Sequence, residues 1–379
     1  MMLSTWTPHL FETEIALLPT EEDIAFYQEH GWYISPKILT DEIIEQAILG
    51  SERFYRGERD RVLPKGIGYS DWKPEDGYDV VRNNEFVSLQ NQELRKLALQ
   101  PIIGAIESRL SRSKQIRLLD DKLVYKKHQD KNGKSAVGWH ADRAYWSTCS
   151  SDNLLTAWIP FHDCDELRGP LVVLDKSHKW ADIQDSRYFN NHNLKEIEEK
   201  YRSSVRVPIN LQKGQISFHH CWTIHGSLPN YSNRFRLAMA VHLQDGDNHY
   251  QPFKNSRGRE IHIADEFLCR KLANGYPDFS DPDTFPLIWS ETDNVVGDYI
   301  MSVQINDSQD SLWRETLQKL RYDAYHLPEY VQLEAQRNHT KSEAFLFIED
   351  DKIFFVPYLL RSCNDILDGA TTEEFFDVI

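Results

Sequence analysis

The chain has 379 residues, of which 40% are hydrophobic and 27% charged, so it can form one large or two ordinary packed domains. Its 43 basic and 59 acidic residues give a formal net charge of −16, which argues against a nucleic-acid groove or an anionic membrane surface as partner. No apolar run approaches the ~18–20 residues of a membrane span, and Met1–Leu10 lacks a signal-peptide pattern.

The cysteines of the chain argue against both a disulfide framework and a thiolate zinc site. They are odd in number, far apart and never arranged as Cys-x-x-Cys. Reduced thiols of a cytoplasmic protein are the expectation that fits this pattern. The five positions are Cys149, Cys164, Cys221, Cys269 and Cys363.

Three helical segments are predicted in the first third of the chain, at 20–31, 40–50 and 94–110. Thr20 is a capping residue followed by three acids, and Gly31 is a stop signal. Gly50 is expected to end the second segment, and Pro101 to bend or divide the third.

The middle of the chain changes to short β-prone runs separated by Gly, Pro, Asn or Asp. These runs are 123–125, 155–159, 170–174, 215–218 and 237–241. Helices followed by many short strands predict an α+β fold with an antiparallel sandwich or barrel.

The last third is predicted to divide into a connecting segment and an extension. Residues 250–310 look irregular and are interpreted as a lid or linker. Beyond them we expect helices at about 312–321 and after Pro328, and two strands at 344–348 and 352–356. The predicted domains are therefore 1–300 and a small α/β extension, 301–379.

The strongest chemical signal is the pair His140 and Asp142, which a strand would place on one face because side chains alternate. His225 supplies a third candidate ligand. Two imidazoles and one carboxylate leave three positions of an octahedron open, the arrangement used by non-haem Fe(II) to hold a co-substrate and O₂. For His140 and for His225 the alternative is a histidine with a purely structural role. The neighbours His219 and His220 would point to opposite faces of a strand, and both are interpreted as structural.

A second signal is the pair Arg234 and Arg236 at the start of an apolar run. The fork of an arginine can pair with the distal carboxylate of a metal-bound 2-oxo acid. Solvated charges at a strand edge are the alternative interpretation, and the two arginines alone do not decide between them.

Three stretches together resemble the phytanoyl-CoA dioxygenase family of Fe(II)/2-oxoglutarate oxygenases over residues 15–250. They are His140-x-Asp142 with Trp146 and 156–160, the run 169–179, and His225-Gly-Ser with Arg236 eleven residues later. The resemblance implies a double-stranded β-helix, a cupin-like jelly roll, with flanking helices.

Carried over residue by residue, the resemblance implies that His140, Asp142 and His225 are the iron ligands. It implies that Arg236 binds the far carboxylate of 2-oxoglutarate. Two further residues match positions that flank this co-substrate, and two more on the preceding strand are weaker candidates. These four are Ser227 and Trp158, and then Leu123 and Lys127.

The expected activity is oxidation of a small-molecule metabolite by Fe(II), 2-oxoglutarate and O₂, with release of succinate and CO₂. Hydroxylation is the default outcome, and desaturation, cyclisation or epimerisation of a biosynthetic intermediate are alternatives. Asp142 favours oxygenation, since related halogenases have Gly or Ala there. Arg143, Tyr145 and Trp146 directly follow the metal motif and are candidates for substrate contact, with plain packing as the alternative.

Two rival functions come from other classes. One is a zinc- or manganese-dependent cupin-type isomerase or hydrolase, which would use the same ligands without Arg236. The other is a non-catalytic partner protein, because Trp313–Leu359 faintly resembles the opening of a GNAT-type N-acyltransferase domain without its acetyl-CoA loop. Neither nucleic acid nor membrane is expected as a partner, and the sequence leaves the oligomeric state open.

Overall fold

The computed structural model of the chain describes residues 10–77, 81–128, 135–180, 204–255 and 257–291, and the backbone of 342–349 and 352–359. The chain divides into two compact units, Thr7–Ser302 and a second one that combines Met1–Trp6 with Val303–Ile379. Each unit is described by itself. The boundary predicted after residue 300 stays a prediction, because most of the second unit lies outside the described residues.

The described helices of the main unit include the three predicted segments and two short helices, the first and the last, that were not predicted. They are α1 (Glu12–Ile15), α2 (Glu21–His30), α3 (Asp41–Tyr55), α4 (Gln92–Ala98), α5 (Pro101–Ser111) and α8 (Asp265–Leu268). Thr20 caps α2 by accepting a hydrogen bond from the backbone N–H of Asp23, and Gly31 ends it with a φ of 80°. Pro101 separates α4 from α5 at the first position of the latter, as expected.

The prediction that Gly50 ends a helix is wrong, since α3 continues to Tyr55. Gly50 is needed for a close contact between helices instead. The side chain of Asn91, which caps α4, donates a hydrogen bond to the Gly50 carbonyl oxygen, and a Cβ at position 50 would lie 2.6 Å from Asn91 Oδ1.

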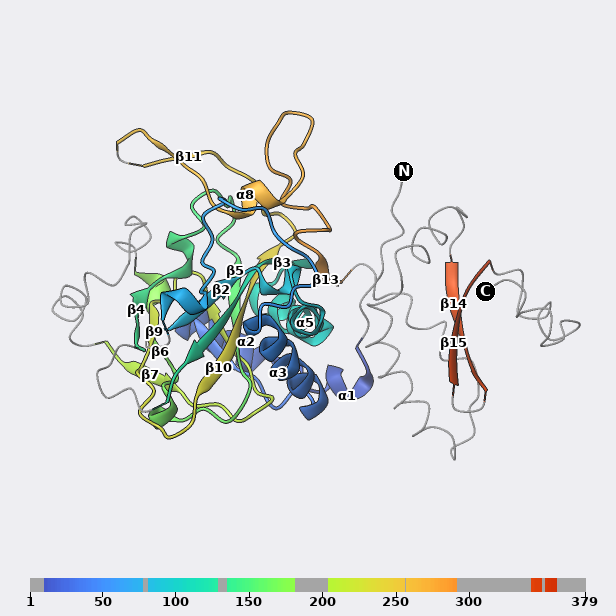
Figure 1. Cartoon of the computed structure of the whole chain (residues 1–379), viewed down its shortest axis with the longest axis horizontal. Coiled ribbons are helices and arrows are strands. Elements are labelled where there is room, and N and C mark those ends of the chain that lie inside the picture. The colour runs from blue at the N-terminus through green and yellow to red at the C-terminus, as the bar shows by residue number, and fades with distance from the viewer. Residues whose placement is uncertain are drawn as a thin grey trace, which may run out of the picture. The chain divides into compact units, whose positions relative to one another are not determined.

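Two antiparallel sheets form the centre of the main unit (Figure 1). The larger has the strand order β1-β8-β5-β10-β3-β13, with β2 also paired to β3, and the smaller has the order β4-β9-β6-β7. The strands of the larger sheet are β1 (Trp32–Ile34), β2 (Arg82–Glu85), β3 (Gln115–Lys126), β5 (Leu154–Pro160), β8 (Ser217–His220), β10 (Arg236–Asp245) and β13 (Leu287–Ser290). Those of the smaller are β4 (Val137–His140), β6 (Leu171–Leu174), β7 (Arg206–Ile209) and β9 (His225–Ser227).

From β3 to β10 the chain crosses between the two sheets repeatedly, so each sheet collects strands distant in sequence. This is the arrangement of the predicted double-stranded β-helix. No pair of strands in the described part of the chain joins the two sheets into a closed barrel. All five predicted strands of this region are confirmed: three lie within β3, β5 and β10, and the runs 170–174 and 215–218 overlap β6 and β8, which begin one and two residues later.

The two faces of the larger sheet have different partners because strand side chains alternate. On one face of β10, Leu237, Met239, Val241 and Leu243 are buried, and α5 packs against this sheet. The other face carries Arg236, Ala238, Ala240 and His242. Ala240 is only half-buried although β10 is a central strand. The small side chains of Ala238 and Ala240, and the partial exposure of Ala240, indicate that large side chains do not fill the space over this part of the sheet.

The segment predicted to be an irregular lid or linker contains regular structure in its described part. It forms the short strands β11 (Phe253–Lys254) and β12 (Glu260–Ile261), then α8 and β13. Strand β13 pairs with β3 and extends the larger sheet. The remainder, beyond 291, lies outside the described residues.

In the second unit, β14 (Ser342–Glu349) and β15 (Lys352–Leu359) form an antiparallel hairpin. This pair confirms the two strands predicted there. The helices predicted at 312–321 and after Pro328 lie outside the described residues, and the likeness to an N-acyltransferase stays a prediction.

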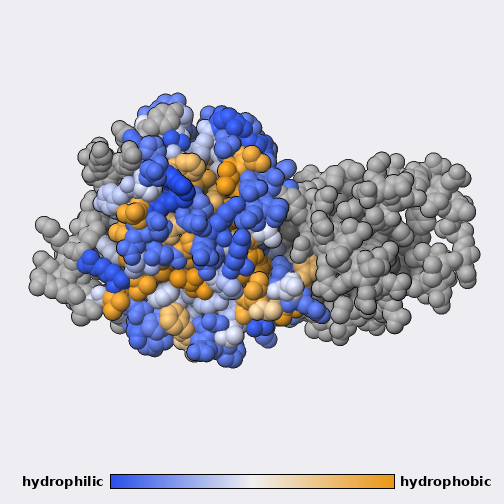
Figure 2. Space-filling model, turned by 90° about the horizontal axis from the view of Figure 1, so that it is seen from below, coloured by the Kyte–Doolittle hydropathy of each residue, from blue (hydrophilic) through white to orange (hydrophobic). Residues whose placement is uncertain are grey.

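The surface of the main unit is mixed in polarity. On the face drawn in Figure 2, hydrophilic residues surround several patches of apolar ones. Within the described ranges, no helix combines the length and the apolar character that crossing a membrane requires.

Candidate metal centre

Three side chains from two neighbouring strands and a turn meet between the sheets. His140 ends β4 and lies opposite His225, the first residue of β9. Asp142 begins a 3₁₀ turn, Asp142–Ala144, so a turn and not strand alternation brings it beside His140. Their ligand atoms all lie within 4.8 Å of one another. Among the described residues, these two imidazoles and one carboxylate form the group that could hold a metal ion.

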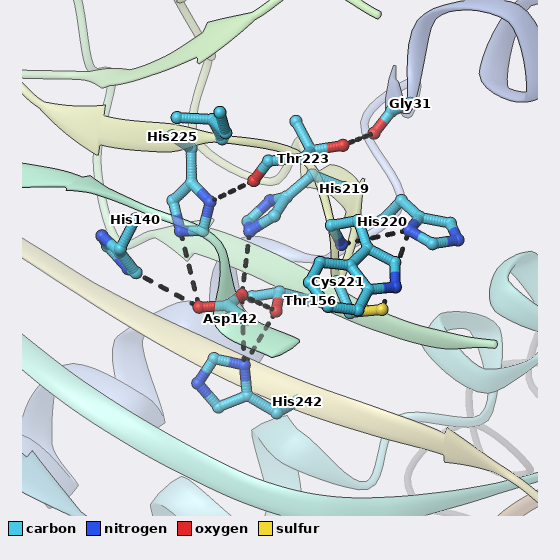
Figure 3. A network of polar contacts seen from close by, with 12 residues as sticks. Gly31, His140, Asp142, Thr156, His219, His220, Cys221, Thr223, His225 and His242 are labelled. Atoms are coloured by element: carbon cyan, nitrogen blue, oxygen red, sulfur yellow. Dashed lines mark hydrogen bonds and ion pairs between the residues drawn. The ribbon is translucent and has the colours of Figure 1, made fainter. Parts of the chain in front are cut away.

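The geometry of the three residues is nearly symmetrical about one carboxylate oxygen (Figure 3). The Nε2 atoms of His140 and His225 each lie 3.6 Å from Asp142 Oδ1. The centroids of the two imidazole rings are 4.2 Å apart. Two nitrogens and one oxygen therefore face a common point.

Backbone hydrogen bonds fix the tautomer of both imidazoles. Nδ1 of His140 donates to the Gly138 carbonyl oxygen over 2.8 Å, and Nδ1 of His225 donates to that of Thr223 over 2.9 Å. A carbonyl only accepts, so the proton is on Nδ1 and the lone pair of Nε2 faces Asp142. Such outer partners are typical of metal-binding histidines.

The electrostatics of the site favour a cation between these atoms. Burial, together with the neighbouring imidazole, lowers the pKa of His140 to about 4, and burial lowers that of His225 to about 4. Burial alone would raise the pKa of Asp142, but the surrounding histidines hold it well below the usual range. At neutral pH the group is two neutral imidazoles and one carboxylate, the protonation state that metal binding needs.

A group of buried polar residues lies on the same face of the larger sheet, at the start of β10. Arg236 is 1% exposed, and its guanidinium carbon lies 5.5 Å from the centroid of the Trp158 ring. Its cross-strand partner on β3 is Lys126, whose Nζ donates to Ser227 Oγ over 2.6 Å. The structure thus brings together the predicted residues Arg236, Trp158 and Ser227, and adds Lys126.

Arg236 is a buried cation with little compensation from the protein. Its Nε has no hydrogen-bond partner among the described residues, and desolvation lowers its pKa to about 10. The interpretation of Arg236 as a solvated strand-edge charge is wrong, whereas Arg234 is exposed and fits it. A buried charge of this kind needs an anionic partner.

Leu123 and Lys127 do not join this group. Leu123 pairs with Met239, whose side chain lies on the helix-covered face of the sheet. Lys127 follows the end of β3 and is exposed. The alternation of β3 instead places Lys126 and Lys122 on the site face, which sequence reasoning missed because the strand register was unknown.

Two of the three predicted substrate residues have structural roles. The Arg143 guanidinium donates hydrogen bonds to Asp152 and to the carbonyl oxygens of Trp146 and Cys149, so it fixes the loop after the metal motif. Trp146 is buried in an apolar cluster and donates from Nε1 to Asp120 Oδ2 over 3.2 Å. These contacts support the alternative that both residues serve packing.

Tyr145 is placed differently, with 49% of its surface exposed and its ring centroid 5.8 Å from that of His140. Nearby, Lys122 on β3 forms a 3.2 Å ion pair with Glu85 on β2, and its Nζ lies 5.5 Å from the Tyr145 ring centroid. Lys122 and Glu85 were also missed, because their positions depend on the pairing of β2 with β3.

A family model described as "Phytanoyl-CoA dioxygenase (PhyH)" matches residues 27–238 of the chain. The peroxisomal phytanoyl-CoA dioxygenase of Bos taurus is 26% identical over 288 residues, which cover 73% of this chain and 82% of that protein. The Homo sapiens enzyme is 25% identical over 261 residues, covering 64% and 73%.

Among solved structures, the non-haem α-ketoglutarate-dependent carbocyclase SnoK from nogalamycin biosynthesis aligns with a TM-score of 0.55 and 24% identity, covering 71% of this chain and 96% of SnoK. EctD from S. alaskensis, determined with 2-oxoglutarate and 5-hydroxyectoine, aligns with a TM-score of 0.54 and 14% identity, covering 72% and 88%. These likenesses show that the main unit has the fold of cupin-like jelly-roll oxygenases.

Proposed function

The chain belongs to the phytanoyl-CoA dioxygenase family of Fe(II)- and 2-oxoglutarate-dependent oxygenases, and from that membership we propose that His140, Asp142 and His225 hold its iron. The observation that carries the proposal is the approach of both imidazole Nε2 atoms to Asp142 Oδ1, each at 3.6 Å. Nitrogen and carboxylate ligands suit Fe(II), and three protein ligands leave coordination positions for the co-substrate and O₂.

Bound iron allows O₂ to convert 2-oxoglutarate to succinate and CO₂, with one oxygen atom entering succinate and the other available to oxidise the substrate. The protein's part is to present neutral imidazoles and a charged carboxylate. His140 and His225 keep their protons on Nδ1, where they donate to the Gly138 and Thr223 carbonyl oxygens, so both Nε2 lone pairs remain available.

Arg236 is proposed to bind the far carboxylate of 2-oxoglutarate, with Trp158 and Ser227 beside it. The support is its burial, its Nε that has no hydrogen-bond partner among the described residues, and the second buried cation, Lys126, opposite it across the strands. A carboxylate there would receive charge-assisted hydrogen bonds in a site from which water is excluded. A hydrolytic or isomerising cupin enzyme would have no use for this cation.

The substrate is proposed to be a small polar molecule that contacts Tyr145 and the Lys122–Glu85 pair. This pair offers a hydrogen-bond donor and an acceptor beside the metal ligands, and it is only partly exposed. Because Lys122 is already paired with Glu85, this pair carries no net charge toward the substrate, which favours a neutral polar substrate over an anionic one. Hydroxylation is the proposed outcome; desaturation, cyclisation and epimerisation use the same residues.

A cytoplasmic location is proposed from the cysteines. The four in the described part of the chain, Cys149, Cys164, Cys221 and Cys269, are buried and form no disulfide. This is the state expected in a reducing compartment.

The test is release of succinate from 2-oxoglutarate by the purified full-length protein in air, measured with and without Fe(II). We expect release that depends on Fe(II) and falls to the metal-free level in His140→Ala, which removes a ligand nitrogen. His249→Ala, a substitution of an exposed histidine, is the matched control. Release that persists in His140→Ala, or no Fe(II)-dependent release by the unaltered protein, would contradict the proposal.

A further inference from the structure

The two oxygens of the Asp142 carboxylate have different surroundings. Oδ1 faces the Nε2 atoms of His140 and His225. Oδ2 accepts a 2.5 Å hydrogen bond from Thr156 Oγ1 and lies 3.3 Å from His219 Nε2 (Figure 3). The group is 3% exposed, so these contacts replace the water that would otherwise solvate the second oxygen.

The hydrogen bonds on the Oδ2 side have a consistent direction. The single hydroxyl proton of Thr156 goes to Asp142, so Thr156 accepts from His242 Nδ1 over 2.8 Å. His242 then has its lone pair on Nε2, which lies 3.4 Å from Asp120 Oδ1. His219, with its own Nε2 toward Oδ2, donates from a second direction.

The three supporting residues belong to three adjacent strands of the larger sheet. Thr156 of β5 is registered with His219 of β8 on one side and with His242 of β10 on the other. All three are buried. Asp142 itself follows β4 of the opposite sheet. Three adjacent interior strands of one sheet therefore hold the carboxylate that the other sheet presents.

We propose that Thr156 and His219, backed by His242, are positioning residues that keep Oδ2 of Asp142 away from the metal, so that this aspartate supplies Oδ1 alone. The inference depends on the proposed iron ligands. A carboxylate that bound through both oxygens would fill a fourth position of an octahedral ion, so its Oδ2 would compete with 2-oxoglutarate and O₂ for the metal. With one oxygen bound, two positions serve 2-oxoglutarate and one remains for O₂.

The contacts of Thr156, His219 and His242 that hold Oδ2 of Asp142 are called the clamp. Thr156→Val tests it, since valine keeps the shape of threonine and removes the hydroxyl. We expect 2-oxoglutarate to bind the Fe(II)-loaded full-length variant at least about 10-fold more weakly, because the released Oδ2 would compete with its oxygens for the metal; loss of an outer partner typically costs ~10–100-fold in metal affinity or activity. The measurement is an anaerobic titration followed by the visible charge-transfer absorption of the Fe(II)–2-oxoglutarate complex. Thr156→Ser, which restores the hydroxyl, should bind within about 3-fold of the unaltered protein.

Thr148→Val is the matched control, because Thr148 is also buried and its hydroxyl has no hydrogen-bond partner among the described residues. It should leave the titration unchanged. A second pair, His219→Leu and His219→Gln, tests the other contact: leucine should weaken 2-oxoglutarate binding and the amide N–H of glutamine should restore much of it. Melting temperatures of the metal-free variants separate this effect from misfolding.

The outcomes distinguish the clamp from the proposed function. Unaltered protein that shows no charge-transfer absorption would contradict the iron site itself. Absorption in the unaltered protein together with the same titration in Thr156→Val and His219→Leu would overturn the clamp and leave the iron site standing. Weakened binding that Thr156→Ser does not restore would also overturn it, since the hydroxyl would then not be the cause.

Discussion

Arg236 places a positive charge in the interior beside Trp158 and Lys126, where the described part of the protein gives its Nε no acceptor. A buried charge without a partner destabilises the folded state, so we expect a ligand of opposite charge to bind Arg236. At the residue scale, this is the feature that most clearly separates an oxygenase using a 2-oxo acid from other metal-binding jelly rolls.

Arg236→Gln is predicted to weaken 2-oxoglutarate binding roughly 30-fold or more, because loss of one partner of a buried charge pair costs ~2–5 kcal/mol. Fe(II) binding should change little, since Arg236 is not a proposed ligand. The measurement is the concentration of 2-oxoglutarate that half-saturates succinate release. Arg234→Gln, at an exposed arginine two residues earlier, should behave like the unaltered protein. Equal effects of the two substitutions would count against the assignment.

The sequence predicts individual site residues best where a short motif specifies them. His140, Asp142 and His225 are visible in this way, and the structure brings them together. Lys126 and Lys122 could be found only by knowing which β3 residues pair with the β10 residues whose side chains point toward the site. Arg143 was a substrate candidate because it directly follows the metal motif. Its structural role could not be predicted, because two of its three acceptors are backbone carbonyls of a loop whose path the sequence does not reveal.

At the scale of elements, α5 contains an unusual buried acid. Glu107 is fully buried on this helix, and neither of its carboxylate oxygens has a hydrogen-bond partner among the described residues. Burial, and secondarily Asp245, raises its pKa well above 4.5. The folded protein therefore keeps a proton that the unfolded chain releases above that pH, so this group lowers stability as the pH rises.

Glu107→Gln is predicted to stabilise the protein increasingly above about pH 4.5, by about 1.4 kcal/mol for each pH unit up to the pKa of Glu107 in the folded protein, because only the unaltered protein must take up a proton to fold. Below that pH the two proteins should unfold alike, because glutamine resembles the protonated acid. Thermal unfolding across pH 4–8 measures the difference, with exposed Glu52→Gln as the control. A difference that does not grow with pH would show that the acid is solvated in the folded state.

Element boundaries follow the local sequence where a capping residue or proline sets them, and depart from it where tertiary contacts decide. Thr20 and Pro101 act as predicted. Gly50 does not end α3, because its role is to admit Asn91 from another helix. Strand β13 was missed for the same reason: its pairing with β3 joins segments about 170 residues apart, which no local pattern records.

For the whole molecule, the fold class could be predicted but the neighbours within each sheet could not. The succession of helices and short strands, together with the family resemblance, indicated a double-stranded β-helix. The clamp of Thr156, His219 and His242 on Asp142 depends on the lateral order β8-β5-β10, which three separate segments create only after folding. The site residues discussed all lie within Thr7–Ser302.

The most direct test of this account is a crystal structure of the full-length protein with Mn(II), as a redox-inert substitute for Fe(II), and the 2-oxoglutarate analogue N-oxalylglycine. Anomalous scattering should place the metal on His140 Nε2, Asp142 Oδ1 and His225 Nε2, and the far carboxylate of the analogue on Arg236. Metal bound instead through His219 or His242, or an analogue carboxylate away from Arg236, would contradict it.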